Sequence, residues 1–373
     1  MVRRIPRWIY PLALALCVLS AGSVPAVQAQ GQPAAQASFA QPSFAKLVEQ
    51  LSEPGGFFDT DNLISNEKSY LHVIPRLEQG GVSGGVYIGV GPDQNFSYIA
   101  RIRPRSAFII DIRRDNLLLH LLFKALFAES RNRVEFLSLL TGRRVPADVE
   151  RWRNATIDQL VAYIDAATPS GSALSGRRLH EAIRRFGVPV SDQELATIDR
   201  LHAAFVGAGL SLQFQTIGRP VQSYNPTYRE LLIETDLKGR KLSYLASEDD
   251  FQFVRSLQAR DAVIPVVGDL SGTHALAAIG KWMIERNERL SAFYVSNVED
   301  YLFRGGVFGR YMENLKRLSH SDRTVVVRSI FGRAALPETV TGYYSLSTVQ
   351  DFDDLLAGYA SGKYRTYSDL PRR

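Results

Sequence analysis

The sequence predicts an α/β protein with a doubly wound, mostly parallel sheet and one helical insertion. Two observations carry this prediction. Short apolar segments alternate with helical patterns along the chain, and the alternation stops once, over residues 141–245, where the period is helical throughout. The length of 373 residues and an apolar content of 45% are typical of a globular protein with a large core.

The amino terminus predicts a cleavable export signal over residues 1–29. Three arginines within the first seven residues precede an apolar run, Trp8–Gly22, and a small-residue cleavage pattern ends at Ala29. The run of about 15 residues is shorter than the ~20 that a spanning helix needs. We therefore expect an exported, periplasmic protein with no stable membrane span, an uncleaved anchor being the alternative. Residues 30–45 are expected to form a flexible leader.

Charge and cysteine content exclude several functional classes. Without the three arginines of the signal, the chain has 41 Lys and Arg and 38 Asp and Glu. The resulting net charge of +3 does not indicate a nucleic-acid-binding protein. Cys17 is the one cysteine and lies within the signal, so the mature chain excludes disulfides, cysteine-ligated zinc and iron–sulfur clusters. The six histidines show no metal-ligand spacing, and no metal is expected.

The α/β domain is expected over residues 46–373. Five apolar segments bounded by turn residues are predicted strands: Gly85–Ile88, Ala107–Ile110, Ala262–Val267, Ser291–Val295 and Thr324–Ile330. Helical patterns separate them at residues 95–102, 116–140, 273–287 and 309–318. Residues 342–347 and 364–370 are predicted to add edge strands.

Within the insertion, three helices are predicted. The first covers residues 157–167 behind a Thr156 capping box, the second covers 177–186, and the third begins after Ser191 and runs to residue 206. Insertions at the carboxyl edge of an open sheet often form lids or substrate walls, and a simple spacer is the alternative.

A glycine turn and an acid suggest a nucleoside site. The first strand ends in Gly89-Val90-Gly91 and runs into a helix, whose free N–H groups face the cleft. Asp111 ends the next strand, 22 residues after Gly89, where such an acid accepts hydrogen bonds from ribose hydroxyls. The alternative is that Asp111 caps a helix or pairs with Arg113 or Arg114.

Two further groups stand at the ends of later strands. Asp269 follows the third strand in a Gly-Asp turn and would lie beside a purine or its ribose. Asn297 and Glu299 end the fourth strand, where the sheet reverses its order and ligands bind. The alternatives are an ordinary turn at Asp269 and helix capping by Asn297 and Glu299.

Taken in order, these segments resemble class I S-adenosylmethionine-dependent methyltransferases and, more closely, an uncharacterised bacterial family of exported proteins with a methyltransferase-like sheet. The resemblance covers about residues 57–330 and rests on these runs: Phe58-Asp-Thr-Asp-Asn62 to Tyr70, Gly85 to Asn95, Asp111-Ile-Arg-Arg114, Val266 to Leu270 and Tyr294 to Tyr301.

The resemblance implies S-adenosylmethionine as the cofactor, with the acceptor not predicted. By likeness, Gly89 and Gly91 would approach the methionine end, Asp111 would hold the ribose and Asp269 would flank the adenine. Asn297 and Glu299 would border the transfer site, with Glu299 as the base if one is needed. Such loops carry an acid where this chain has Tyr87, and Asp93 either crowds the cofactor's carboxylate or replaces that acid.

Two other functions stay open from the sequence. One is a non-catalytic periplasmic binding protein that retains the fold. The other is a sugar-nucleotide enzyme that uses Asp59 and Asp61 of a D-x-D pattern. A nucleophile elbow at Gly81–Gly85 is disfavoured, because the strand follows the serine instead of preceding it.

Overall fold

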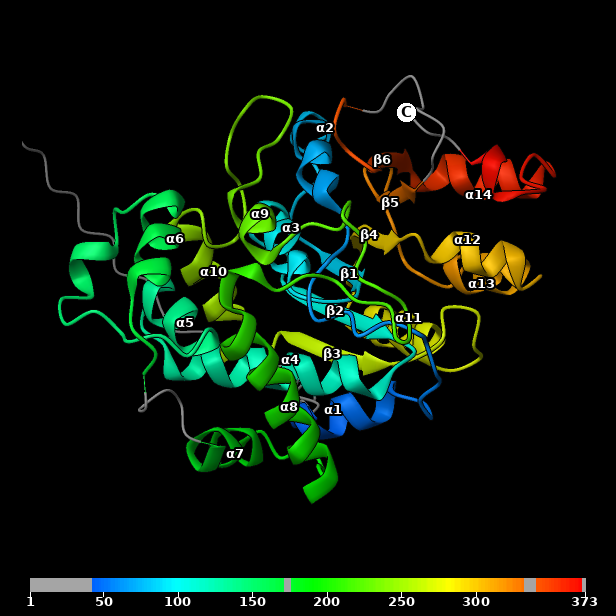
Figure 1. Cartoon of the computed structure of the whole chain (residues 1–373). Helices are drawn as coiled ribbons and strands as arrows, with labels where there is room; N and C mark the ends of the chain where they lie inside the picture. The colour runs from blue at the N-terminus through cyan, green and yellow to red at the C-terminus, as the bar shows by residue number, and fades with distance from the viewer. Residues whose placement is uncertain (1–41, 171–175, 332–339, 371–373) are drawn as a thin grey trace, which may run out of the picture. The chain divides into compact units, whose positions relative to one another are not determined.

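Six strands form one sheet in the computed structural model, which describes residues 42–170, 176–331 and 340–370. They are β1 (Val86–Val90), β2 (Ser106–Asp111), β3 (Val263–Val267), β4 (Leu290–Ser296), β5 (Val325–Phe331) and β6 (Ser345–Asp351). The strand order is β3-β2-β1-β4-β5-β6 (Figure 1). The first five strands are parallel, and β6 is antiparallel to β5.

The helices surround this sheet. They are α1 (Phe44–Leu51), α2 (Ile74–Gln79), α3 (Gln94–Ile102), α4 (Arg114–Glu129), α5 (Arg133–Leu140), α6 (Ile157–Ala166), α7 (Gly176–Arg185), α8 (Asp192–Ala208), α9 (Tyr228–Ile233), α10 (Glu248–Ala259), α11 (Ala275–Glu285), α12 (Val298–Arg304), α13 (Phe308–Leu315) and α14 (Phe352–Ala360). Short 3-10 helices are η1 (Lys68–Val73), η2 (Glu150–Trp152), η3 (Gly209–Ser211) and η4 (Tyr367–Asp369).

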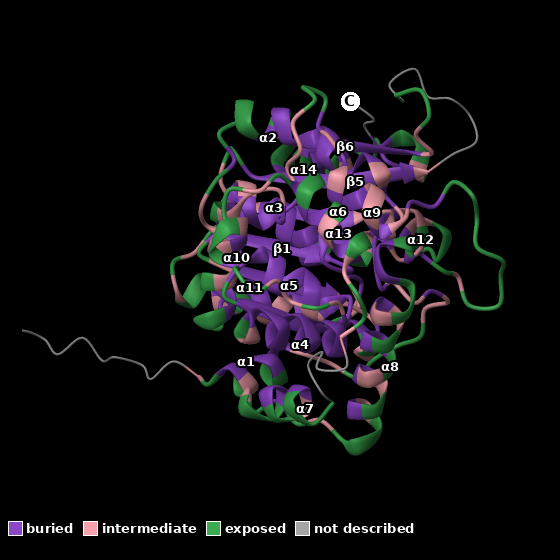
Figure 2. Ribbon diagram, turned by 60° about the vertical axis from the view of Figure 1, so that its left-hand side comes forward, coloured by how far each residue is buried: buried purple, intermediate pink, exposed green. Residues whose placement is uncertain are grey.

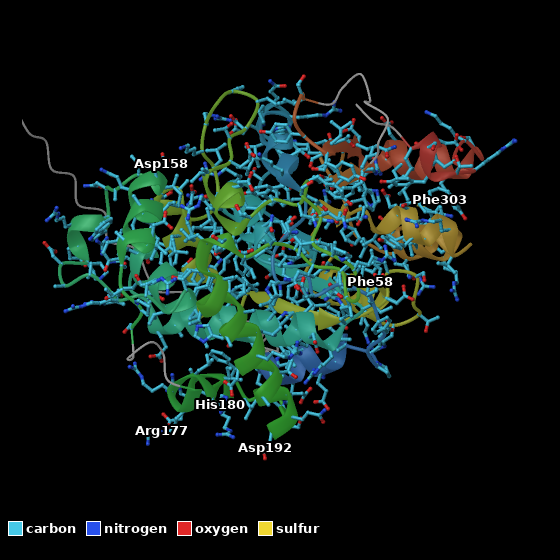
Figure 3. All side chains as sticks on the ribbon, in the orientation of Figure 1. Phe58, Asp158, Arg177, His180, Asp192 and Phe303 are labelled. Carbon is cyan, nitrogen blue, oxygen red and sulfur yellow. The ribbon has the colours of Figure 1, made fainter. Side chains whose placement is uncertain are left out.

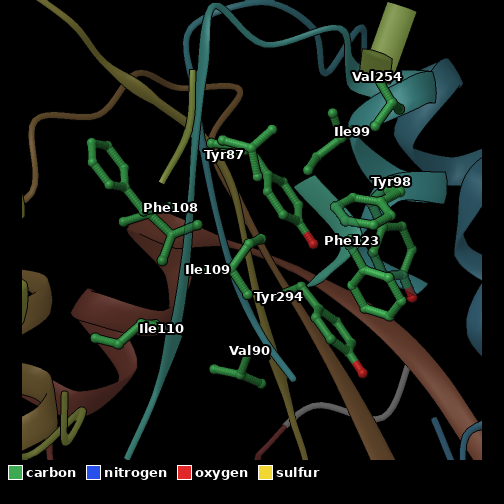
Figure 4. Packing of buried hydrophobic residues seen from close by; sticks show 14 of the residues in the cluster. Tyr87, Val90, Tyr98, Ile99, Phe108, Ile109, Ile110, Phe123, Val254 and Tyr294 are labelled. Atoms are coloured by element: carbon green, nitrogen blue, oxygen red, sulfur yellow. The ribbon is translucent and has the colours of Figure 1, made fainter. Parts of the chain in front are cut away.

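The central strands are buried on both sides, as their continuous apolar sequences predict. Every residue of β1 and β3 is buried, and Figure 2 shows the middle of the sheet enclosed by helices with exposed outer surfaces. Alternate residues of β2 face opposite layers. Figure 4 shows Phe108 and Ile110 on one side of the strands and Tyr98 and Phe123 of the covering helices on the other.

Two helical layers result from this alternation. Helices α3, α4 and α10 pack against one another, and α11 packs against α13. Right-handed crossovers place the helices after β1 and β2 on one face and those after β3 and β4 on the other. The order of the strands reverses between β1 and β4, so a crevice forms at their carboxyl ends. The protein is therefore an α/β protein with a Rossmann-like sheet.

The predicted edge strand at residues 364–370 is wrong. This segment contains η4, because Asp369 accepts hydrogen bonds from the backbone N–H groups of Arg365 and Thr366 and folds the chain into a turn. The other predicted edge strand is present but shifted, as β6. The long helix predicted over residues 116–140 breaks between α4 and α5, where Asn132 caps α5 by accepting from the N–H of Glu135.

Residues 141–245 contain helices α6 to α9 and the loops that join them, and they pack closely on the sheet domain. Capping boxes open α6 at Thr156 and α8 at Ser191. Helices α7 and α8 pack on α4, and α6 packs on α5 and α9. The described residues from Pro42 onward form one compact unit.

The predicted signal and most of the leader lie outside the described residues. The leader ends earlier than predicted, because α1 begins at Phe44 with Ser43 as its cap. Among the described residues, no helix combines the length and the apolar character that crossing a bilayer requires.

Candidate functional site

A cavity of about 270 Å³ lies at the carboxyl ends of β1 to β4. Its volume falls just below the usual range of ligand pockets, roughly 300–1,000 Å³. Phe58 belongs to its wall and is labelled in Figure 3, on the side of the sheet toward which the strand arrows of Figure 1 point. The insertion contributes Phe214.

Four predicted residues meet in this cavity. Gly91 follows β1, Asp111 ends β2, Asp269 follows β3 and Asn297 follows β4, and all four belong to the lining. They are up to about two hundred residues apart in sequence, and the parallel order of the strands brings them to one edge.

Gly91 adopts a left-handed backbone conformation, with φ +84°, which favours glycine. The Nε2 atom of the buried His120 lies 2.9 Å from the carbonyl oxygen of Gly91. Burial lowers the pKa of His120 to about 4, so the imidazole is neutral at pH 7. A neutral ring that donates from Nε2 therefore holds the glycine turn in place.

Asp111 lines the cavity and also forms the ion pair with Arg113 that the sequence offered as an alternative. Arg113 donates from Nη2 to Oδ2 at 2.9 Å and from Nε to Oδ1 at 3.1 Å, and its backbone N–H donates to Oδ1 at 2.9 Å. A carboxylate oxygen accepts about two hydrogen bonds. Oδ2 therefore keeps one acceptor position for a further donor.

Asp269 combines a turn with a place in the lining. Its Oδ1 accepts from the N–H of Ser271 at 2.7 Å and from the Ser271 hydroxyl at 2.9 Å. No group of the described residues donates to Oδ2. The backbone N–H of Asp269 donates to Glu53 at 2.7 Å, which ties the segment after α1 across the carboxyl end of β3.

Asn297 is the N-cap residue of α12, but its side chain makes no capping hydrogen bond. Its Oδ1 lies 3.4 Å from the Ser296 hydroxyl. Ser296 itself has φ +53°, an unusual conformation for a residue with a Cβ. Both residues line the cavity.

Gly89 and Asp93 do not reach the cavity, which corrects two predicted roles. A Cβ on Gly89 would point at the Asn95 side chain, only 1.9 Å from its Oδ1, so this glycine serves the packing of β1 on α3. Asp93 turns toward the insertion and accepts hydrogen bonds from the hydroxyls of Tyr228 at 2.8 Å and Tyr244 at 3.1 Å. Burial raises the pKa of Asp93 to about 6.

Glu299 is also absent from the cavity lining, so the structure does not support its predicted place at the transfer site. Its carboxylate accepts two hydrogen bonds from Arg328, one from Nε at 2.5 Å and one from Nη2 at 3.2 Å. Both side chains are fully buried, which makes this a structural ion pair between α12 and β5.

Glu67 is the main lining residue that the sequence did not predict. It is 1% exposed. Its carboxylate accepts from the hydroxyls of Tyr294 at 2.5 Å, Ser329 at 2.5 Å and Ser296. Burial raises the pKa of Glu67, and these three hydrogen bonds oppose the rise. In the sequence, the only indication of this role was that Glu67 belongs to a run of polar residues directly before η1.

Amides and carboxylates dominate the polar part of the lining. The amides belong to Asn62, Asn66, Gln94 and Asn297, and the acids are Glu67, Asp111 and Asp269. None of the described residues that line the cavity is Lys, Arg or His. An acid-rich site without a base attracts cations and repels phosphate groups.

Asp59 and Asp61 lie outside this cavity. Asp61 lines a separate hollow that shares Phe58 and Thr60 with the cavity wall, and Asp59 pairs with Arg219 at 3.5 Å. Among the described residues, no group of three His, Cys, Asp or Glu side chains is arranged to hold a metal ion.

Residues 63–158 and 214–369 match the model of a family described as a domain of unknown function (DUF7790). The chain belongs to this family. No curated protein matches the chain.

The matched parts of the DUF7790 family contain the cavity residues Glu67, Gly91, Asp111, Asp269 and Asn297. They leave out residues 159–213, which hold most of α6 and all of α7, α8 and η3. The family match therefore follows the sheet and its cavity and omits the middle of the insertion.

Proposed function

We propose that the cavity binds a nucleoside-containing cofactor of the S-adenosylmethionine type, and that the protein is a methyltransferase-like enzyme with a class I sheet. The observation that carries the proposal is the meeting of Gly91, Asp111, Asp269 and Asn297 in one cavity, beside the reversal of strand order. Ligands of open α/β sheets bind at this position.

The charge of the lining supports this class of cofactor over others. S-adenosylmethionine carries a sulfonium and an ammonium group and no phosphate. The cavity presents the carboxylates of Glu67 and Asp269 without a basic lining residue, and Asp111 is paired with Arg113, which lies outside the lining. Dinucleotides and sugar nucleotides bring a pyrophosphate, which these carboxylates would repel. The same argument counts against a sugar-nucleotide enzyme, as does the position of Asp59 and Asp61 outside the cavity.

The four predicted residues of the lining each have a role in this proposal. The remaining acceptor position on Oδ2 of Asp111 takes a ribose hydroxyl. Oδ2 of Asp269, to which no group of the described residues donates, takes a second donor of the nucleoside. The bare Cα of Gly91 permits close approach of the cofactor. Asn297 borders the place where the acceptor's nucleophile meets the methyl group. Alignment of the two reactants and exclusion of water supply the catalysis, so no dedicated base is required.

A non-catalytic binding protein is the second candidate, and the position of Glu299 favours it. The acid predicted at the transfer site is held by Arg328 in a buried pair. Of the two residues predicted at the transfer site, only Asn297 lines the cavity. Transfer of a labelled methyl group to any acceptor in an extract would exclude this candidate.

Isothermal titration calorimetry of the purified protein with S-adenosylmethionine and S-adenosylhomocysteine tests binding. Asp269→Asn keeps the turn at Oδ1 and probes charge at the cavity, whereas Asp111→Asn keeps the side-chain shape but also removes the ion pair with Arg113. Each is expected to weaken binding by about 1.5–3 kcal/mol, the usual cost of a lost charged acceptor. Asp322→Asn is the control, since Asp322 is exposed just before β5, at the amino end of that strand and away from the cavity. Dissociation constants no tighter than about millimolar, or ~4 kcal/mol, would refute the proposal.

We also propose export to the periplasm by the predicted signal. S-adenosylmethionine is a cytoplasmic metabolite, so the compartment bears on the ligand. Cell fractionation tests export, and mass spectrometry of small molecules that copurify with the native protein identifies the ligand in that compartment. A cytoplasmic chain of full length would contradict export.

A further inference from the structure

Two residues of the cavity lining carry buried hydrogen-bond acceptors. Glu67 is 1% exposed and Gln94 is 6% exposed, and both line the cavity. The hydroxyl of Tyr294 joins them, at 2.5 Å from Oε2 of Glu67 and 3.1 Å from Nε2 of Gln94. Through this hydroxyl, the carboxylate and the amide belong to one hydrogen-bond network in the cavity lining.

Among the described residues, the carboxylate of Glu67 has no cationic partner. Its three partners are the hydroxyls of Tyr294, Ser296 and Ser329, and no Lys, Arg or His of the described residues pairs with it. The other two acids of the lining are engaged differently, since Arg113 neutralises Asp111 and Asp269 is only partly buried. Burying a carboxylate without a counter-charge is costly, and three neutral donors offset the cost only in part.

The side-chain oxygen of Gln94 has no partner at all among the described residues. The hydrogen-bond network fixes which end of the amide is the oxygen. Tyr294 has one hydroxyl proton, which it donates to Glu67, so Gln94 must present its N–H to Tyr294. A buried acceptor left without a donor destabilises the protein, and a ligand that supplies the donor removes this cost.

One kind of ligand group satisfies both acceptors. It must carry a positive charge for Glu67 and more than one N–H for the two oxygens. A primary ammonium group has both properties, whereas a sulfonium group has charge but no donor. We propose that Glu67 and Gln94 form a binding site for a primary ammonium group of the ligand. This inference rests on the proposed function and adds the residues that hold the amino group.

The experiment compares two ligands that differ only in this group. S-adenosylhomocysteine carries the α-amino group, and its deamino analogue has hydrogen there. By calorimetry, the unaltered protein is expected to bind S-adenosylhomocysteine about 10- to 100-fold more tightly than the analogue, the usual effect of a charge-assisted hydrogen bond. Glu67→Gln should reduce this ratio to below about 3-fold, while affinity for the analogue changes little.

Two further variants make the result decisive. Gln94→Met removes the second acceptor and should lower the ratio about 5-fold, which tests the site even where Glu67→Gln fails to fold. Glu313→Gln is the matched control, because Glu313 is exposed on α13, and it should leave the ratio unchanged.

The possible failures are distinguishable. Equal affinity for the two ligands in the unaltered protein would overturn the ammonium site and leave the proposed function standing. The same holds if the ratio survives both Glu67→Gln and Gln94→Met. If neither ligand binds, the proposed function is overturned and this inference falls with it.

Discussion

Arg113 clamps Asp111 at two points and reaches past it to a second segment. Besides the carboxylate, the guanidinium donates from Nη1 to the carbonyl oxygens of Thr60 at 2.8 Å and Asp61 at 3.1 Å. One side chain thus joins the end of β2 to the segment that forms a wall of the cavity. The pair fixes the orientation of Asp111 in the cavity lining.

Replacement of Arg113 by Gln should destabilise the protein strongly. The change leaves the carboxylate of Asp111, whose side chain is 10% exposed, without its cation, and it frees two backbone carbonyls. We expect a loss of about 3–5 kcal/mol in the free energy of unfolding, measured by urea denaturation. Arg105→Gln is the control, since Arg105 makes a similar two-point pair with Glu288 at the surface and should cost less than about 1 kcal/mol. Equal losses would contradict the role given to Arg113.

The pair of Glu299 and Arg328 should act on stability and not on the ligand. Glu299→Ala leaves a fully buried guanidinium unpaired, with an expected cost of about 3–5 kcal/mol. The double variant with methionine at both positions should recover most of this loss, because it removes both charges. Chemical denaturation measures stability, and calorimetry of the double variant should show unchanged affinity for S-adenosylhomocysteine. A large loss of affinity would return Glu299 to the site.

Asp93 should make stability depend on pH. Burial raises its pKa in the folded protein to about 6 from 3.8, so the folded state binds the proton more tightly than the unfolded state. The resulting stabilisation is complete below about pH 4 and is lost as the pH rises through about 6. Compared with the unaltered protein, Asp93→Asn should gain about 3 kcal/mol in relative stability between pH 4 and pH 8, measured by urea denaturation across that range. A difference that does not vary with pH would show that Asp93 has an ordinary pKa.

Gly89→Ala should mainly reduce stability, and Gly91→Ala should mainly reduce ligand affinity. At Gly89 the new methyl would overlap Asn95, and overpacking of this kind typically costs about 1–3 kcal/mol. At Gly91 the nearest atom, Nε2 of Gln94, is 3.5 Å away, so only the left-handed backbone opposes alanine, at about 1 kcal/mol. Thermal melts should rank Gly89→Ala as less stable. Calorimetry should rank Gly91→Ala as the weaker binder, since its methyl enters the cavity, and the reverse ranking would contradict the assignment.

The part of the site that sequence predicts is the part that adjoins strands. Gly91, Asp111 and Asp269 each stand directly after a short apolar segment, and parallel strands deliver their carboxyl ends to one edge. Glu299 does not line the cavity, because it stands two residues after Asn297 at the start of a helix. Residues two apart do not share a helix face.

Contacts between distant segments account for the rest. Asp93 faces Tyr228 and Tyr244, which lie 135 and 151 residues later in the insertion, and no local pattern links them. Glu67 precedes every strand and reaches the cavity through hydroxyls of β4 and β5. Its role follows only from the path of the chain across the sheet.

The left-handed backbone of Ser296 has an implication for selection experiments. Glycine at this position would relieve the backbone by about 1 kcal/mol, but it would remove the hydroxyl that contacts Glu67. The lost hydrogen bond costs about as much as the backbone gains, so laboratory evolution for heat resistance alone should tolerate Ser296→Gly, whereas evolution that also demands ligand retention should reject it. Comparison of the residue selected at position 296 under the two conditions would show whether the strained serine is retained because ligand binding requires it.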